Sequence, residues 1–287
     1  MDIPRAISEW FALSGRDLPW RRPGFTPWGT LVSEFMLQQT PVVRVIPRLA
    51  EWLERWPTPA DLAAVPSGEA VRAWQSLGYP RRALNLHAAA VAITDRHGGV
   101  VPHDVEALLA LPGVGDYTAR AVAVFAFGSR HPVVDVNTRR VIARAVRGDG
   151  EPGPASKRDL VDMEALLPQS EADARLANIA FMELGAIVCT ARSPKCEICP
   201  IAAACAWRQA GYPEFEGRRA PVQARFAGSD RQVRGLIMKL LRGSEIAVTR
   251  AEIDGVWADE VQRARALAGL LADGLVVEVP GGFELPS

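Results

Sequence analysis

Apolar residues recur every three or four positions along most of the chain up to about residue 210, which is the spacing of amphipathic helices. Glycines at 78, 98 and 148 and the Thr40-Pro41 pair stand where helices should end or begin. The pattern predicts an all-α fold with helices over 2–14, 27–39, 42–56, 69–76, 81–97, 104–110, 116–127, 136–147, 156–167 and 171–187.

The pattern changes after residue 212. Residues 213–228 are rich in glycine, proline and arginine and are typical of a linker. Beyond them, helices are predicted over 233–242, 250–257 and 259–272, and two short strands around a Pro-Gly-Gly turn follow. Three helices and a hairpin indicate a small winged-helix-like module over 229–287. Some modules of this kind bind DNA and others bind only proteins, so the fold alone does not assign a role.

Composition places the chain among globular proteins. Its 287 residues are enough for two or three domains, and they are 48% hydrophobic and 23% charged. No apolar run approaches the roughly 20 residues of a membrane span, and the start Met1-Asp2-Ile3-Pro4 does not have the form of a signal peptide. We therefore expect a soluble, cytoplasmic protein.

The formal net charge is zero, so no global field attracts a polyanion. The chain has only three lysines, Lys157, Lys195 and Lys239, and its other cations are arginines. These arginines form groups that either bind phosphate or are solvated surface charges. The groups are Arg81-Arg82, Arg139-Arg140 with Arg144, and Arg218-Arg219.

All four cysteines fall within one short segment, at Cys189, Cys196, Cys199 and Cys205. Disulfides are not expected in a chain without a secretion signal. Structural zinc is the main alternative, but four-thiolate zinc sites usually have two close pairs and a longer spacer. One close pair with short gaps favours a compact loop around a [4Fe-4S] cluster.

Residues 111–128, LPGVGDYTARAVAVFAFG, read as a helix end, a glycine turn and a second helix. Gly113 and Gly115 allow backbone N–H groups at the helix N-terminus to point outward and hold an anion such as a DNA phosphate. An ordinary turn is the alternative. Further on, Asp135 follows Val133-Val134 and precedes a helix, which predicts an N-cap whose carboxylate stays ionised.

Six segments together resemble the helix-hairpin-helix DNA glycosylases, and within them the MutY-type adenine glycosylases, over about residues 5–210. They are LPWR (18–21), VSEFMLQQT (32–40), LGY (77–79), LPGVGDYTA (111–119), VVDVNTRRV (133–141) and the cysteine loop. The resemblance implies excision of adenine mispaired with 8-oxoguanine. It also implies a cluster-bearing domain (1–22 and 133–212) and a six-helix barrel (23–132), which grip DNA across a cleft.

The same resemblance implies the catalytic residues. Glu34, with Leu31 and Leu37 at i−3 and i+3, would be buried and protonated, and would give a proton to the departing adenine. Asp135 would stabilise the oxocarbenium-like sugar, and Asn137 would help to position the catalytic groups. Tyr117 stands where strand-cleaving relatives carry a Schiff-base lysine, which predicts little or no strand scission.

The resemblance also implies the DNA contacts. Gln39 and Tyr79 match residues that wedge into the duplex, although Pro80 replaces a second aromatic common in relatives, and Gln38 would also contact the DNA. Residues of the hairpin turn would hold a phosphate, namely Gly113, Val114, Gly115 and Thr118. The partner is then double-stranded DNA containing a mismatched adenine, bound by a monomer at the nucleoid.

Residues 219–287 are too short and too helical for the Nudix-like domain that such enzymes commonly use to recognise 8-oxoguanine. Either the C-terminal module replaces it or the core discriminates alone. Two alternatives remain open. One is a thymine or uracil mismatch glycosylase, and the other is a non-catalytic iron-sulfur DNA-binding redox regulator, in which Glu34 has no role.

Overall fold

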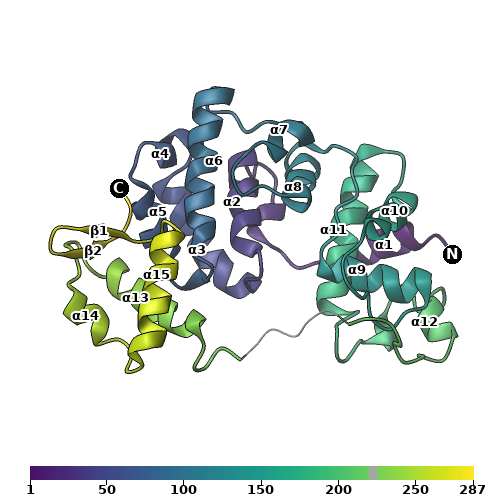
Figure 1. Cartoon of the computed structure of the whole chain (residues 1–287). Coiled ribbons are helices and arrows are strands. Elements are labelled where there is room, and N and C mark those ends of the chain that lie inside the picture. Colours follow the sequence, from purple (N-terminus) through teal and green to yellow (C-terminus); the bar gives the residue numbers. More distant parts are fainter. Residues whose placement is uncertain (220–224) are drawn as a thin grey trace. The chain divides into compact units, whose positions relative to one another are not determined.

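The computed structural model describes residues 1–219 and 225–287, so residues 220–224 of the predicted linker lie outside the described part. Chain contacts divide the molecule into two compact units (Figure 1). Unit 1 contains Met1–Phe25, His103–Val105 and the chain from Gly115 to the linker. Unit 2 contains Thr26–Pro102, Glu106–Val114 and the chain after the linker.

Unit 1 is helical, and its core lies where α1, α9 and α11 pack together around Ile7, Val141 and Phe181. Its helices are α1 (Ile3–Ser14), α8 (Asp116–Phe127), α9 (Val136–Ile142), α10 (Lys157–Leu166), α11 (Glu171–Ile187) and α12 (Ala206–Gln209). A π-helical turn, Ala143–Arg147, continues α9, and 3-10 turns cover Pro19–Arg21 and Cys196–Ile198.

Local sequence explains where these helices begin and end. The Asp2 and Ser170 side chains cap α1 and α11 by accepting backbone N–H groups. Ser156 forms a capping box with Asp159 at the start of α10. The predicted stop at Gly148 is confirmed, since this residue ends the π-helical turn with a left-handed φ of 78°.

Helix α8 belongs to unit 1, whereas the sequence-based boundary at residue 132 grouped it with the barrel. The reason is packing. Ala121 and Val124 of α8 form a buried cluster with Val133, and Tyr117, Phe125 and Met182 pack against it. The helix therefore lies on the residues that lead into α9, and its amphipathic pattern alone could not show this.

Unit 2 contains a helical body and the C-terminal module. The helices of the body are α2 (Pro27–Leu37), α3 (Val42–Arg55), α4 (Pro59–Ala63), α5 (Ser67–Trp74), α6 (Arg81–His97) and most of α7 (Val105–Leu109), with a 3-10 turn at Gln75–Leu77. Helix α6 contacts α2, α4 and α5. Buried tryptophans fill the centre, and the Trp52 ring meets the rings of Trp56 and Trp74 edge to face at 4.7 and 5.6 Å.

The predicted stops at Gly78 and Gly98 are confirmed, with φ of 83° and 59°. The prediction that Thr40 is the N-cap of a helix that starts at Pro41 is wrong, because α3 begins at Val42 and Pro41 occupies the cap position. The Thr40 hydroxyl instead donates to Leu77 O and accepts from Arg82. Among the described helices, none is long and apolar enough to cross a membrane.

The C-terminal module has the predicted winged-helix order. Helices α13 (Asp230–Arg242), α14 (Arg250–Asp254) and α15 (Glu260–Ala272) precede the antiparallel strands β1 (Val277–Val279) and β2 (Gly282–Glu284). Val248, between α13 and α14, adds a bridge to Phe283 of β2. Helix α13 packs on α15, and both bury apolar residues such as Ile237 and Leu270.

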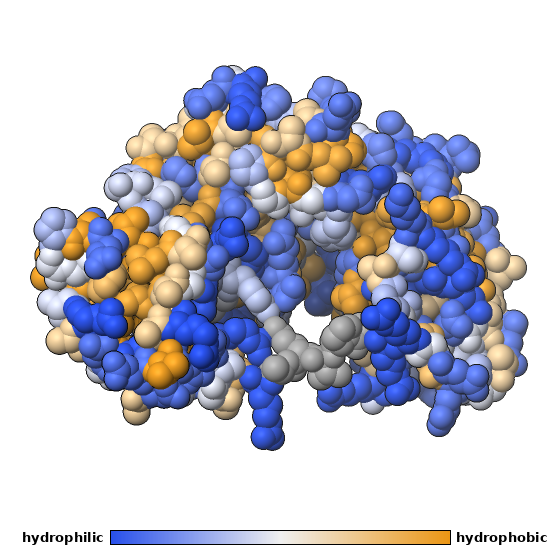
Figure 2. Space-filling model, in the orientation of Figure 1, coloured by the Kyte–Doolittle hydropathy of each residue, from blue (hydrophilic) through white to orange (hydrophobic). Residues whose placement is uncertain are grey.

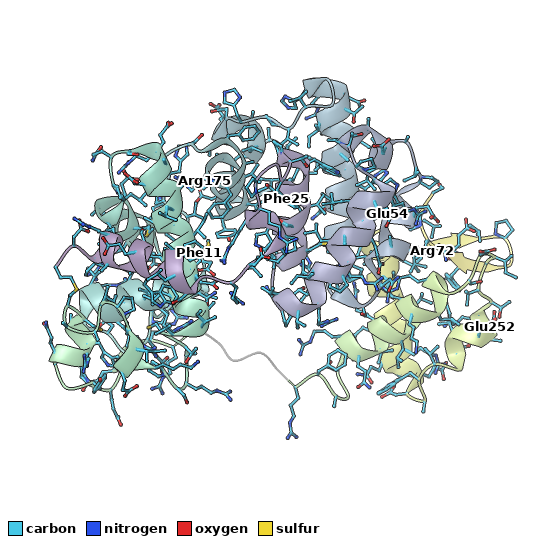
Figure 3. The ribbon with its side chains drawn as sticks, turned by 180° about the vertical axis from the view of Figure 1, so that it is seen from behind. Phe11, Phe25, Glu54, Arg72, Arg175 and Glu252 are labelled. Carbon is cyan, nitrogen blue, oxygen red and sulfur yellow. The ribbon has the colours of Figure 1, made fainter. Side chains whose placement is uncertain are left out.

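The module docks on α5 of the same unit. Arg72 of α5 is labelled in Figure 3. Its Nη1 donates to Arg242 O at 2.6 Å and to Ser244 O at 2.9 Å. The Gly68 N–H donates to Pro286 O at 2.7 Å, and a Cβ on Gly68 would lie 2.4 Å from that oxygen. Glycine is therefore required at this contact.

The C-terminal module carries no excess of basic residues. Residues 229–287 contain nine acidic and seven basic residues. The two arginines of α15 are engaged within the module, Arg263 with Asp254 and Arg265 with Asp230. The exposed face of α15 carries Val261, Ala264 and Ala268, and hydrophobic residues show on the viewed face of the module (Figure 2).

Candidate active site

Glu34 lies in α2, the most completely buried helix of unit 2. The Thr26 side chain accepts the Gly29 N–H at 3.0 Å, and Pro27 occupies the first turn, so the helix has a well-defined start. Nine of its 11 residues are buried, and Glu34 itself is only 5% exposed. A carboxyl group in such surroundings is costly to ionise unless its charge is compensated.

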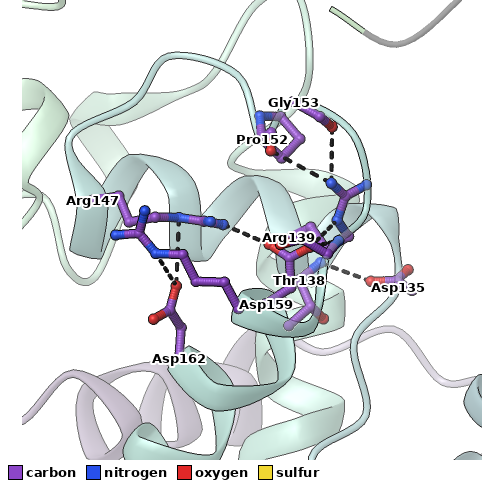
Figure 4. A network of polar contacts seen from close by, with 10 residues as sticks. Asp135, Thr138, Arg139, Arg147, Pro152, Gly153, Asp159 and Asp162 are labelled. Carbon is purple, nitrogen blue, oxygen red and sulfur yellow. Dashed lines mark hydrogen bonds and ion pairs between the residues drawn. The ribbon is translucent and has the colours of Figure 1, made fainter. Parts of the chain in front are cut away.

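Asp135 lies at the N-terminus of α9 in unit 1, and both of its carboxylate oxygens accept hydrogen bonds. Oδ1 accepts the Thr138 N–H at 2.7 Å, which confirms the predicted N-cap (Figure 4). Oδ2 accepts from Asn137 Nδ2 at 2.7 Å. Both oxygens are thus engaged as acceptors, and the side chain is held at the helix N-terminus.

Asn137 is itself held in one orientation. Its Oδ1 accepts from Arg140 Nη2 at 2.9 Å, so its NH₂ group must face Asp135. Arg140 in turn donates to Gly185 O at 2.6 Å and Cys189 O at 2.7 Å. A Cβ on Gly185 would lie 2.6 Å from Asn137 O, so glycine at 185 lets α9 approach α11. The arrangement fixes Asp135 through Asn137 and Arg140.

A second network holds the far end of α9 (Figure 4). Arg139 Nε and Arg147 Nη2 donate to the two oxygens of Asp159 at 2.9 and 2.8 Å. Burial opposes ionisation of Asp159, but hydrogen bonds from the Ser156 N–H, Arg147 and Arg139 outweigh it and lower its pKa. Arg139 also donates to Gly153 O at 2.8 Å, so α9, α10 and the intervening loop form one framework.

The glycine turn before α8 is as tight as predicted. Gly113 has a φ of 75°, and a Cβ there would lie 2.5 Å from Asn85 Cβ on α6. Gly115 is the N-cap of α8, and the Val114 N–H donates to Leu111 O at 3.2 Å inside the turn. Tyr117 is the second residue of α8, and the neighbouring Thr118 is 3% exposed.

The predicted wedge residues lie on two exposed turns of unit 2. Gln39 is exposed and Tyr79 is 43% exposed. Both adopt left-handed backbone conformations, with φ of 55° and 47°. Such conformations are uncommon for residues other than glycine and cluster at functional sites. Gln38 precedes Gln39 as the C-cap residue of α2.

The arginine groups are not simple phosphate patches. Arg82, Arg140 and Arg144 are only 7%, 8% and 4% exposed, and their guanidinium groups donate mainly to backbone carbonyls. Their neighbour Arg81 pairs with Asp273, and Arg219 pairs with Glu151. The interpretation of these arginines as either phosphate ligands or solvated charges was therefore wrong for the three buried ones.

The four cysteines line one cavity in unit 1. Apolar side chains, including Leu184, Val188 and Ile201, form its walls. Arg144 holds the loop, because Nη1 donates to Thr190 O at 2.7 Å and Nη2 donates to Ala191 O at 3.1 Å. Nη1 also lies 3.5 Å from Cys189 Sγ.

This cavity suits a metal-sulfur group. Burial raises the pKa of Cys199 to about 11, and burial also raises the pKa of Cys189 against the opposing effect of Arg144. Bare thiolates are therefore disfavoured, whereas a cationic metal core would compensate their charge. Cys189, Cys196, Cys199 and Cys205 are the residues that would hold a [4Fe-4S] cluster.

Comparison with known proteins defines the class. Residues 32–161 match the HhH-GPD superfamily of base excision DNA repair proteins. Residues 189–205 match the iron-sulfur binding domain of endonuclease III and include all four cysteines, so the chain carries a [4Fe-4S] site. The fold and these matches define an iron-sulfur DNA glycosylase of the helix-hairpin-helix class.

The full chain gives a narrower assignment. It is 53% identical to the adenine DNA glycosylase of Mycobacterium tuberculosis, with 99% of this chain and 95% of that protein covered. It is 54% identical to that of Mycolicibacterium smegmatis, with 97% and 94% covered. The solved structure of a thermostable thymine-DNA glycosylase is 30% identical, covers 72% of this chain and 95% of that chain, and has a TM-score of 0.66. The chain belongs to the family of adenine DNA glycosylases.

The sequence analysis named Arg82, Arg140 and Arg144 as phosphate ligands or surface charges and missed that they support the site from within. Each lies in a helix with buried apolar neighbours, which was an available signal. Their acceptors could not be read from the sequence. Arg140, for example, donates to carbonyls at residues 185 and 189, more than forty positions away.

Proposed function

We propose that this protein removes adenine paired with 8-oxoguanine, or with guanine, from double-stranded DNA in base excision repair. It would hydrolyse the N-glycosidic bond and leave the strand uncut. The likeness to adenine DNA glycosylases over 97–99% of the chain supports the substrate. The single observation that carries the chemistry is the burial of Glu34 in α2, at 5% exposure.

Glu34 would act first, as a general acid. Adenine is a poor leaving group as an anion, and protonation at N7 lets it depart as a neutral base. Burial favours the neutral carboxylic acid that this step needs. Once the proton is transferred, the Glu34 carboxylate is the base for the incoming water.

Asp135 would act on the sugar. Loss of the base leaves an oxocarbenium-like C1′, and a fixed negative charge stabilises it. The hydrogen bonds from Thr138 and Asn137 hold the Asp135 carboxylate in place before the reaction, so little reorganisation is needed as charge develops. Arg140 supports Asn137 from the opposite side.

Strand scission would be weak or absent. A lyase needs an amine that forms a Schiff base. Tyr117 occupies the matched position, and Lys157, Lys195 and Lys239 lie in α10, the cysteine loop and α13. Borohydride treatment of the reaction mixture should trap no covalent complex with DNA, and efficient trapping would contradict this proposal.

The enzyme would bind its substrate as a monomer at the nucleoid in the cytoplasm. Flipping the adenine out of the stack costs a few kcal/mol, and the turns that carry Gln38, Gln39 and Tyr79 would fill the gap. The glycine turn would hold a phosphate through Gly113, Val114, Gly115 and Thr118. The [4Fe-4S] cluster, when bound, would order the cysteine loop and supply no acid or base.

The test compares excision from A:8-oxoguanine, A:G and T:G duplexes under single-turnover conditions. The parent should act on the two adenine pairs and not on T:G. Glu34→Gln keeps the shape of the side chain and removes the acid, so the rate should fall by about 10²-fold or more. Duplex affinity should be retained. If Glu34→Gln excises adenine as fast as the parent, the mechanism is wrong.

Two other functions give different outcomes in the same assay. A thymine or uracil mismatch glycosylase, the class of the 30% identical solved structure, would act on T:G alone. A redox regulator would bind a specific DNA sequence according to the oxidation state of its cluster and would excise nothing from any duplex.

A further inference from the structure

Arg82 is the second residue of α6, is 7% exposed and has no carboxylate among its hydrogen-bond acceptors in the described chain. Burial lowers its pKa to about 10, so it remains a cation at neutral pH. Its acceptors are five backbone carbonyls and one hydroxyl. Nη1 donates to Phe35 O (2.7 Å), Met36 O (3.0 Å) and Gln38 O (2.7 Å), and Nη2 donates to Thr40 Oγ1 (2.9 Å), Leu77 O (3.3 Å) and Gly78 O (3.0 Å).

One group of acceptors surrounds the turn after α2. Gln38 O and Thr40 Oγ1 flank Gln39, whose φ of 55° is unfavourable for a residue with a side chain. Phe35 O and Met36 O are among the last carbonyls of α2, which lack partners within the helix and attract a cation. Phe35 is the residue directly after Glu34, so Arg82 grips the catalytic helix as well as the turn.

The other group surrounds the turn before α6. Leu77 O and Gly78 O precede Tyr79, whose φ is 47°. The Arg82 guanidinium carbon lies 5.7 Å from the centre of the Tyr79 ring and 5.1 Å from that of Trp74. These distances allow cation–π attraction to both rings. Arg82 therefore contacts both the backbone carbonyls of this turn and the rings of Tyr79 and Trp74.

Thr40 links the two turns directly. Its hydroxyl donates to Leu77 O at 3.1 Å while it accepts from Arg82. One guanidinium and one hydroxyl thus join two exposed turns that are about forty residues apart in the sequence. If these turns served the fold alone, glycine at 39 and 79 would adopt the same backbone without strain. Strained, exposed residues other than glycine cluster at functional sites, so the backbone of Gln39 and Tyr79 points to a use for their side chains.

We propose that Arg82 is a positioning residue that makes the Gln39 and Tyr79 turns one rigid wedge and ties this wedge to the helix of Glu34. The inference rests on the proposed function, because it assigns Gln39 and Tyr79 to the opening of the duplex. Arg82 does not touch the reacting atoms. It acts by keeping the two turns at a fixed separation when they enter the base stack.

The test uses the full-length, cluster-loaded protein and two readouts. The first is the fluorescence of 2-aminopurine placed beside the A:8-oxoguanine pair, which rises when neighbouring bases unstack. The second is the single-turnover rate of adenine excision. Arg82→Lys keeps the charge but loses the planar fork that reaches six acceptors. Thr40→Val is a milder variant, which removes the direct hydrogen bond from the Thr40 hydroxyl to Leu77 O and the bond that this hydroxyl accepts from Arg82, and leaves the other Arg82 contacts in place.

Arg72→Lys is the matched control. Arg72 also donates to two backbone carbonyls in unit 2, but at the C-terminal module rather than at the wedge turns. Both lysine variants should lower thermal stability. Only Arg82→Lys should lower the fluorescence rise and slow excision by about tenfold or more, because small displacements of positioning groups have large kinetic effects. Thr40→Val loses only one direct contact between the turns, so excision should slow by about threefold. Arg72→Lys changes no contact at the turns, so its rate should stay within about twofold of the parent.

A rescue experiment separates positioning from general damage. On a duplex in which the adenine is bulged and already unstacked, Arg82→Lys should regain most of the parent rate. If it stays equally slow there, or if Arg72→Lys loses unstacking to the same extent, the inference is wrong. If Arg82→Lys does not fold, parent-like unstacking and excision by Thr40→Val would overturn it. A parent that excises no adenine would refute the proposed function instead.

Discussion

Asp135 caps α9, and under the proposed function the same side chain also stabilises the sugar; the two tasks can be separated. Asp135→Asn keeps an oxygen that accepts the Thr138 N–H, so the cap of α9 should survive. It removes the negative charge beneath the proposed oxocarbenium ion. We expect excision to fall by about 10²–10³-fold, as measured by single-turnover kinetics. Thermal unfolding should show a modest loss of stability, because the NH₂ group introduced at position 135 would face the Asn137 NH₂ group.

Asp135→Ala is the control for the cap. It should lose the same activity and, in addition, about 1 kcal/mol of folding free energy, because the Thr138 N–H loses its partner. An Asp135→Asn protein that retains the parent rate would remove Asp135 from the chemistry and leave it as a cap alone.

At the residue scale, sequence could predict what local spacing encodes. The N-cap role of Asp135 follows from the apolar Val133-Val134 pair before it and the helix after it, and the structure confirms it. The burial of Glu34 follows from its apolar neighbours, and it is also confirmed. The role of Arg82 could not be predicted, because its acceptors near residues 36 and 77 come together only in the folded chain.

At the scale of elements, the cysteine loop is held by Arg144, which lies in the π-helical turn that follows α9. Arg144→Met removes hydrogen bonds to Gly150, Thr190 and Ala191 and should cost about 3 kcal/mol locally. We expect less iron per chain and weaker visible absorbance of the cluster after purification. Arg192→Met, a change at an exposed residue of the same loop, should leave the iron content unchanged. Equal iron in both variants would show that Arg144 does not hold the loop.

Sequence predicted long elements well and short ones poorly. The amphipathic pattern located α6 and α11, which have 17 residues each. It missed α4, whose five residues complete hardly more than one turn, although the Thr58 capping box marks its start. It also gave one helix over 136–147, where α9 ends at Ile142 and a π-helical turn follows. The spacing of apolar residues does not reveal the one extra residue that a π-helical turn contains.

At the scale of the whole molecule, the N-terminal segment of unit 1 is joined to α11 by a buried carboxylate. Glu183 accepts from Arg16 and Arg21. Burial opposes its ionisation, but these hydrogen bonds outweigh it and lower its pKa to about 2. Because the folded pKa lies below the unfolded value, the stabilisation is complete above about pH 4.5 and is lost as the pH falls toward 2.

Glu183→Gln should therefore be less stable than the parent by about 3 kcal/mol at pH 7. The difference should shrink by about 1 kcal/mol at pH 4, where the unfolded glutamate of the parent begins to take up a proton. Urea unfolding of both proteins at the two pH values measures this. A difference that grows toward pH 4 would contradict the assigned pKa direction.

The docking of the C-terminal module on α5 gives a second prediction for the whole molecule. Gly68→Ala places a Cβ against Pro286 O, which is backbone and cannot easily move. We expect a loss of about 1–3 kcal/mol by overpacking. Gly235→Ala is the control, because Gly235 lies on the exposed face of α13 and a Cβ added there would have no atom within 4 Å. It should stabilise the same module by up to about 1 kcal/mol. Parallel thermal unfolding compares the two, and equal shifts would contradict the close contact.

Domain organisation was only partly accessible from sequence. The helix and hairpin order of the module followed from local patterns and is confirmed. Its attachment to unit 2 was not predicted, because it depends on single contacts such as that between Gly68 and Pro286. The assignment of α8 to unit 1 likewise depends on contacts between Ala121, Val124 and Val133.

Under the proposed function, the left-handed backbone at Gln39 and Tyr79 costs stability at two positions that contact the duplex. Glycine at 39 would relieve about 1 kcal/mol of strain. On the same proposal, that gain in stability would come with the loss of a side chain that opens the duplex.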